Sequence, residues 1–182
     1  MAIDIQIAVQ IPEKAFAGYA AALKPPVVLK VIGMRLTEWM TTRFERDGAV
    51  PDFGAGGWVP LKPSTIAQRR QGSSRPLQDT GGLRQSYEAA PTTDGSSYVE
   101  VGSNKRYASF HERGTGPYTI VPKKARLLAA RASAGGWIVF GTKVNHPGLP
   151  ARPVLPTVEQ AEILMTQEVE AMLEAEALRA GH

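Results

Sequence analysis

The chain of 182 residues contains no cysteine and only three histidines. The lack of cysteine excludes disulfides, thiol catalysis and cysteine-ligated zinc. A zinc or non-haem iron site would need His111 and His146 together with carboxylates from distant parts of the chain, because His182 is the last residue. We therefore expect no metal and no other cofactor.

Long apolar runs are also lacking. No stretch approaches the roughly 18–20 apolar residues that a membrane span needs. The N-terminal segment "MAIDIQIAVQ" alternates and carries Asp4, so it lacks the basic region and apolar block of a signal peptide. A hydrophobic content of 43% and a charged content of 21% are typical of a globular chain. We expect a protein that folds in a cytoplasm and has no membrane partner.

Acidic residues are scarce in the middle of the chain. Residues 61–155 hold 14 Lys and Arg against 5 Asp and Glu, whereas residues 156–182 hold 6 Glu against Arg179 alone. Such asymmetry indicates nearby nucleic acid, or self-assembly in which an acidic element meets a neighbour's basic one. A solvated mixture of surface charges explains it equally well. The candidate DNA-facing or inter-subunit residues are Arg69, Arg70, Lys105, Arg106, Lys123, Lys124 and Arg126.

Hydrophobic periodicity predicts both helices and strands. The predicted helices cover residues 12–23, 27–46, 65–72, 81–90 and 157–178, with one or two further turns in 105–114. The predicted strands cover residues 1–11, 96–103, 117–124, 125–132 and 136–144, the last two forming an apolar hairpin. This order lacks the regular alternation that builds a parallel sheet. The predicted fold class is α+β, with an antiparallel sheet packed against a long N-terminal helix and a C-terminal helix.

Particular positions within these elements can also be predicted. We expect Gly48 to end the long helix, Ser64 to cap the next one, and residues 73–76 to be a flexible connection. Residues 1–25 are predicted to form a strand or arm that could augment a neighbour's sheet, and residues 26–182 a single domain. The predicted inward faces of the two long helices are Leu29, Ile32, Leu36, Trp39 and Met40, and Val158, Ala161, Met165, Val169 and Met172.

The stretch "LQDTGGLRQSY" (77–87) has two interpretations. Asp-Thr-Gly is the signature of aspartic proteases, in which two aspartates share one proton. The motif occurs once here and follows a polar, proline-broken approach, which disfavours that role. The alternative is a helix start, with Asp79 or Thr80 accepting a hydrogen bond from the first turn, and Leu83 and Tyr87 on the inner face. Because no P-loop, H-E-x-x-H or G-x-S-x-G motif is present either, we expect no enzyme.

Four stretches in order carry a family resemblance. They are "RFERDGAVPDFGAGGWVPLKPSTIAQRR" (43–70), "PLQDTGGLRQSY" (76–87), "YVEVGSNKRYASFHERGT" (98–115) and "HPGLPARPVLP" (146–156). The set resembles the tailed-bacteriophage virion-morphogenesis family, the tail-completion proteins of Mu-like and P2-like phages. The last stretch is also similar to tail-completion or neck proteins of phages with long non-contractile tails. The motif residues are Arg43, Phe44, Trp58, Pro60, Leu61, Asp79, Thr80, Gly81, Leu83, Tyr107, His111, Gly114, His146, Pro147, Gly148, Arg152 and Pro153.

The resemblance implies a structural role in the virion. Family members complete the tail or join it to the head, typically as a ring, often hexameric, through which DNA passes. The implied partners are further copies of the chain, neck or head-connector proteins, the tail tube protein and passing genomic DNA. In this interpretation Tyr107, Phe110 and His111 face inward, and His111 is hydrogen-bonded rather than catalytic. The alternative is a non-specific nucleic-acid-binding protein without a virion role.

Overall fold

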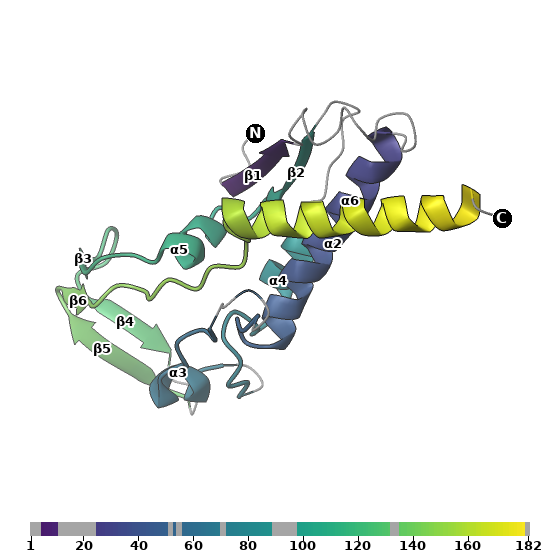
Figure 1. The fold of residues 1–182 in the computed structure, drawn as a ribbon. Helices are drawn as coiled ribbons and strands as arrows, with labels where there is room; N and C mark the ends of the chain where they lie inside the picture. Colours follow the sequence, from purple (N-terminus) through teal and green to yellow (C-terminus); the bar gives the residue numbers. More distant parts are fainter. Residues whose placement is uncertain are drawn as a thin grey trace.

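The computed structural model describes residues 5–10, 25–50, 53, 56–69, 72–88, 98–131 and 135–180. Its helices are α2 (Pro25–Glu45), α3 (Pro63–Ala67), α4 (Gly82–Glu88), α5 (Ala108–Arg113) and α6 (Val158–Ala180). Its strands are β1 (Ile5–Gln10), β2 (Tyr98–Ser103), β3 (Tyr118–Ile120), β4 (Leu128–Arg131), β5 (Trp137–Gly141) and β6 (Val144–His146). The α+β class is confirmed (Figure 1). The helix predicted at 12–23 lies outside the described residues.

The strands of the described residues pair in three antiparallel sheets of two strands each, β1–β2, β3–β6 and β4–β5. The predicted hairpin is confirmed as β4–β5. In the first sheet Ile5 lies opposite Ser103 and Gln10 opposite Tyr98. The sequence suggested β1 as an arm for a neighbour's sheet, but β1 pairs with β2 of its own chain. The division of the chain at residue 25 stays a prediction.

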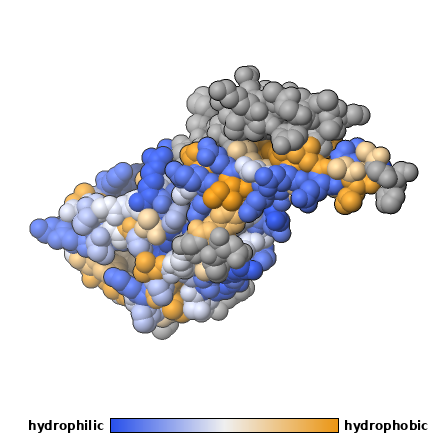
Figure 2. All heavy atoms as spheres, viewed as in Figure 1, coloured by the Kyte–Doolittle hydropathy of each residue, from blue (hydrophilic) through white to orange (hydrophobic). Residues whose placement is uncertain are grey.

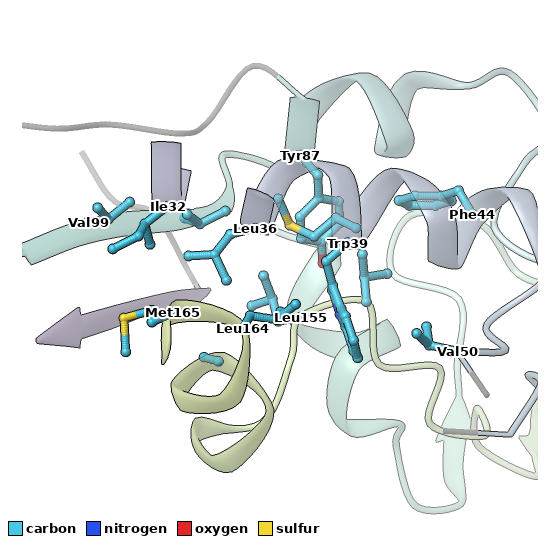
Figure 3. Close-up of a cluster of buried hydrophobic side chains, with 14 of the residues drawn as sticks. Ile32, Leu36, Trp39, Phe44, Val50, Tyr87, Val99, Leu155, Leu164 and Met165 are labelled. Carbon is cyan, nitrogen blue, oxygen red and sulfur yellow. The ribbon is translucent and has the colours of Figure 1, made fainter. Parts of the chain in front are cut away.

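Helix α2 is the centre of the hydrophobic core. Its apolar side chains pack against β2, α4 and α6, as Figure 3 shows for residues from these elements. The predicted inward face is confirmed, because all five of its residues are buried: Leu29, Ile32, Leu36, Trp39 and Met40. Full burial of one such side chain stabilises the fold by roughly 1.5–3 kcal/mol.

Helix α6 begins with a capping box. The Gln160 amide N donates to Thr157 Oγ1, and the Thr157 amide N donates to Gln160 Oε1 at 2.9 Å, so two amides of the first turn are satisfied. Ala161 and Met165 are buried as predicted, together with Leu164. Val158 was predicted on the same face, but it is 62% exposed because it lies in the first turn, ahead of the buried residues.

The C-terminal end of α2 is held by a distant loop. Gly48 adopts φ +96°, the left-handed conformation predicted for the end of this helix. The Arg75 guanidinium donates to the carbonyl oxygen of Phe44 at 2.8 Å and also to that of Glu45. Arg75 therefore ties the segment 73–76 to the end of α2, and the flexibility of this segment stays a prediction. The predicted Ser64 cap is wrong, because α3 starts at Pro63, two residues earlier than predicted, and Lys62 takes the N-cap position.

Candidate functional site

The Asp-Thr-Gly motif lies in an exposed turn before α4. Asp79 and Thr80 are both exposed. The backbone amide of Gln85 donates a hydrogen bond to the Gly81 carbonyl oxygen at 2.9 Å, where the helix begins. Leu83 is buried, as predicted for the inner face. This geometry is that of a helix start. The capping hydrogen bond assigned to Asp79 or Thr80 stays a prediction.

The motif stretches meet around the carboxylate of Glu112. This carboxylate accepts hydrogen bonds from Tyr87 Oη at 2.6 Å, from the Val154 amide at 2.9 Å and from the Leu155 amide at 3.3 Å. The donors come from the motif stretches 76–87 and 146–156, and the acceptor comes from the motif stretch 98–115. The charge of Arg43, from the first stretch, also acts on Glu112. One side chain thus joins α4, α5 and the chain that leads into α6.

Burial controls the ionisation of this cluster. It raises the pKa of Glu112, while the hydrogen bonds and the Arg43 charge partly oppose that shift. Burial also raises the pKa of Tyr87, and the neighbouring Glu112 carboxylate adds to the effect. The pKa of Arg43 is lowered by burial. Because both Glu112 oxygens accept hydrogen bonds from the protein itself, the arrangement suits a structural clamp better than a proton donor to a substrate.

The Trp-Val-Pro-Leu loop and the Ala-Arg-Pro segment are tied together. The Arg152 guanidinium donates to the Val59 carbonyl at 3.2 Å and 3.0 Å, and Trp58 Nε1 donates to the Pro153 carbonyl at 2.9 Å. The Arg152 amide also donates to the His111 carbonyl at 2.6 Å. Segments almost a hundred residues apart in the sequence are therefore locked to each other.

Two motif glycines permit a close crossing of the chain. The amides and carbonyls of Thr115 and Leu149 exchange hydrogen bonds at 2.9 Å and 3.1 Å. Gly148 has φ +90°, and a Cβ there would lie 2.1 Å from the Thr115 carbonyl oxygen. Gly114 has φ +69°, and a Cβ there would lie 2.6 Å from the Leu149 carbonyl oxygen. A side chain at either position would push the two segments apart.

Helix α5 presents a different side from the predicted one. Tyr107 is 45% and Phe110 54% exposed, whereas Ala108 is buried. The inward placement of the two aromatic residues is therefore wrong, because α5 starts after Tyr107 and turns Ala108 to the core. His111 Nδ1 is buried and has no hydrogen-bond partner in the described part of the chain, contrary to the prediction. Burial and the Arg152 charge lower the pKa of His111.

The candidate basic residues lie on different elements. Arg69 donates to the carbonyls of Ser73 and Arg75, so its guanidinium serves its own loop. Lys105 and Arg106 are exposed between β2 and α5, and three more exposed cations lie between β3 and β4: Lys123, Lys124 and Arg126. Arg70 lies outside the described residues. Contact with DNA stays a prediction for all of them.

The lobe formed by residues 117–146, which carries β3 to β6, is the feature whose role the sequence did not reveal. Four consecutive apolar residues of β5 are exposed, namely Trp137 (72%), Ile138 (44%), Val139 (60%) and Phe140 (50%). In Figure 2, orange and pale orange side chains are visible at this end of the molecule and along α6. The sequence of β5 did contain an indication of such a surface, because an unbroken apolar strand is typical of one that is covered on both faces.

The described part of the chain contains no candidate metal centre and no membrane-spanning helix. No group of three His, Asp or Glu side chains among the described residues could hold a metal ion. Likewise, the helices of the described residues include none that is long and apolar enough to cross a membrane. The described residues instead form loops that are joined by hydrogen bonds, together with exposed surfaces.

Comparison with known proteins assigns this architecture to a family. The model of the phage virion morphogenesis family matches residues 13–174, a range that includes the four motif stretches and the Glu112 cluster. No curated protein and no solved structure gives a significant match. Because the family match covers most of the 182 residues, the chain belongs to the phage virion morphogenesis family.

Proposed function

We propose that this protein is a structural component of a tailed-phage particle that completes the tail or joins it to the head. In this proposal identical copies form a ring, with six as the expected number, and genomic DNA passes through it. The ring contacts neck or head-connector proteins on one side and the tail tube protein on the other. The match to the phage virion morphogenesis family over residues 13–174 is the observation that carries the proposal.

The contacts of side chains within the four motif stretches support a role without catalysis. Trp58, Arg152 and Glu112 direct their polar atoms at backbone groups of their own chain. Side chains used in this way fix the shape of loops and leave no reactive group aimed at a substrate. A protein of this kind acts through its surfaces, which is what a joining element of a particle needs.

Removal of the gene from a producing phage tests the proposal. We expect separate heads and tails, or tails of abnormal length, in electron micrographs, and normal particles when an intact copy is supplied from a plasmid. A copy with Met34→Ala, which alters one exposed α2 side chain (63%), is the matched control and should restore particles as well as the wild type does. Normal infectious particles without the protein would contradict the proposal.

A non-specific nucleic-acid-binding role outside the virion is the second candidate. It is favoured by residues 113–158, which contain seven Lys and Arg and no Asp or Glu. Binding driven by phosphate contacts strengthens steeply at low salt. Filter binding over a salt series should therefore show a steep slope that Lys123→Ala/Lys124→Ala/Arg126→Ala reduces. Negligible binding at low salt removes this candidate, and the presence of the protein in purified particles favours the first.

A further inference from the structure

We infer that the β4–β5 hairpin of one copy packs on the acidic outer side of α6 in the next copy. The inference rests on the proposed function, and it names the two surfaces through which copies of the chain join. The contact is head-to-tail, because it uses two different surfaces of the same chain. Contacts of this type close into rings when the rotation between copies allows it.

The hairpin lacks a covering layer of its own. Its two strands pair only with each other among the described residues, with Arg131 opposite Trp137 and Ala130 opposite Ile138. Because side chains alternate along a strand, Trp137 and Val139 lie on one face and Ile138 and Phe140 on the other. All four are at least 44% exposed. An isolated two-stranded hairpin is marginally stable in water, and an exposed patch of this kind is typical of a protein contact.

The charged side chains around the hairpin are all positive. The lobe contains no Asp or Glu, and its cations are Lys123, Lys124, Arg126, Arg131 and Lys143, all exposed. Within the described residues none of these five forms an ion pair. A partner surface that suits the lobe is therefore both apolar and acidic.

Helix α6 supplies such a surface. Its exposed side carries Glu159, Glu162, Glu170 and Glu174 at helical spacing, with Ile163 (47% exposed) between them. Among the described residues, Glu162, Glu170 and Glu174 take part in no ion pair.

A groove of about 680 Å³ runs beside this side of α6. Phe53, Ile163 and Leu164 provide its apolar lining. Arg35, the one cation among the described residues that line it, is already paired with Glu38 and Glu168. An aromatic side chain of the hairpin could enter the groove while the lobe's cations face the glutamates.

The arrangement of the two surfaces favours a second copy over DNA. The hairpin lies at one end of the molecule, and α6 runs from the middle of the molecule to the opposite end (Figure 1). Phosphates would satisfy the cations but would leave Ile138 and Val139 in water. The six glutamates of α6 would also repel a DNA backbone. A neighbour's α6 satisfies the charge and covers the apolar face that carries Trp137 and Val139.

Disulfide trapping tests the contact directly, because the chain has no cysteine of its own. We expect a mixture of the Val139→Cys and Ile163→Cys variants, oxidised with diamide, to give a covalent dimer on a non-reducing gel. The double variant Val139→Cys/Ile163→Cys should give a ladder of linked copies. As a matched control, Met34→Cys, on the exposed surface of α2, should link to Val139→Cys at least tenfold less.

A charge exchange provides the second readout. Lys123→Glu/Lys124→Glu/Arg126→Glu and, separately, Glu162→Lys/Glu170→Lys/Glu174→Lys should each weaken association at least tenfold, with an unchanged melting temperature. In the chain that carries all six changes, the charge of both surfaces is reversed, so this chain should regain most of the association. If the variant with all six substitutions associated no better than either triple variant, the inference would be overturned.

The outcomes separate the inference from the proposed function. A ring that forms without the 139–163 cross-link overturns the hairpin–α6 contact and leaves the virion role intact. A monomer that gives no cross-link and is absent from particles overturns both. Lobe variants that lose only DNA retention, while association stays unchanged, overturn the inference and identify nucleic acid as the partner of the lobe.

Discussion

The body of the molecule and its lobe use apolar side chains in opposite ways. In the body, built from β1, β2, α2, α4 and α6, large apolar residues from several elements form one buried cluster. In the lobe, residues 117–146, no described residue is buried, although β5 is as apolar as any strand of the chain. The body therefore has a core of its own within one chain, whereas the lobe has none, and in the inferred contact a second copy covers it. Substitutions in the two regions should consequently change different quantities, stability in one and association in the other.

The largest loss of stability is expected from Phe44→Ala in the body. Phe44 is fully buried, with its ring 5.6 Å from that of Trp58 and 5.9 Å from that of Tyr87. Truncation should lower the free energy of unfolding by about 3–5 kcal/mol, because it leaves a cavity in the core. Urea denaturation measures this. Phe140→Ala, at a 50% exposed position of the lobe, is the matched control, and an equal loss there would contradict the division into body and lobe.

The next largest loss is expected from Glu112→Ala. This change leaves Tyr87 Oη and the amides of Val154 and Leu155 without their acceptor. The free energy of unfolding should fall by roughly 3 kcal/mol, the cost of leaving several donors unpaired in a partly buried site. Glu112→Gln keeps one acceptor oxygen and should cost about half as much. If the two variants were equally stable, the clamp role of the carboxylate would be wrong.

A smaller, pH-dependent effect is expected from His111. Its folded-state pKa lies below the ordinary value of 6.5, so the folded protein prefers the neutral ring. The stabilising contribution is complete above pH 6.5 and is lost as the pH falls from there through the lowered pKa, because the unfolded chain binds the proton first.

Thermal melts of the wild type and of His111→Asn over this range check the pH effect. Glu112, whose pKa is raised, acts in the opposite direction in both proteins, so the difference between them reports His111. A difference in melting temperature that does not change with pH would contradict the assignment.

Much of the fold follows from sequence periodicity, and the exceptions have physical reasons. The inward face of α2 is predictable because a helix of 21 residues repeats its pattern over several turns. Helix α5 has six residues, and a pattern of one or two turns does not fix which side meets the core, so Tyr107 and Phe110 were misplaced. The three-residue strand β6 is too short to show alternation.

The candidate site was harder to predict than the fold. Glu112 was missed because the amides it binds lie 42 and 43 residues away and carry no sequence signature. Apart from Asp79, Thr80 and Leu83, which the predicted helix start already involved, most motif residues were found only through the family resemblance. The exposed hairpin was predicted as a strand pair, but its lack of cover is a property of the three-dimensional arrangement, which periodicity does not report.

The mass in solution of Trp137→Ser/Phe140→Ser, compared with that of the wild type, tests most directly whether the lobe is an assembly surface. Both residues are at least half exposed. The free energy of unfolding of the double variant should therefore lie within about 0.5 kcal/mol of the wild-type value. Light scattering should give a multiple of the 19.6 kDa chain mass for the wild type and a single chain mass for the variant. Equal masses for the two proteins, or a variant that fails to fold, would contradict the division between a self-sufficient body and an assembling lobe.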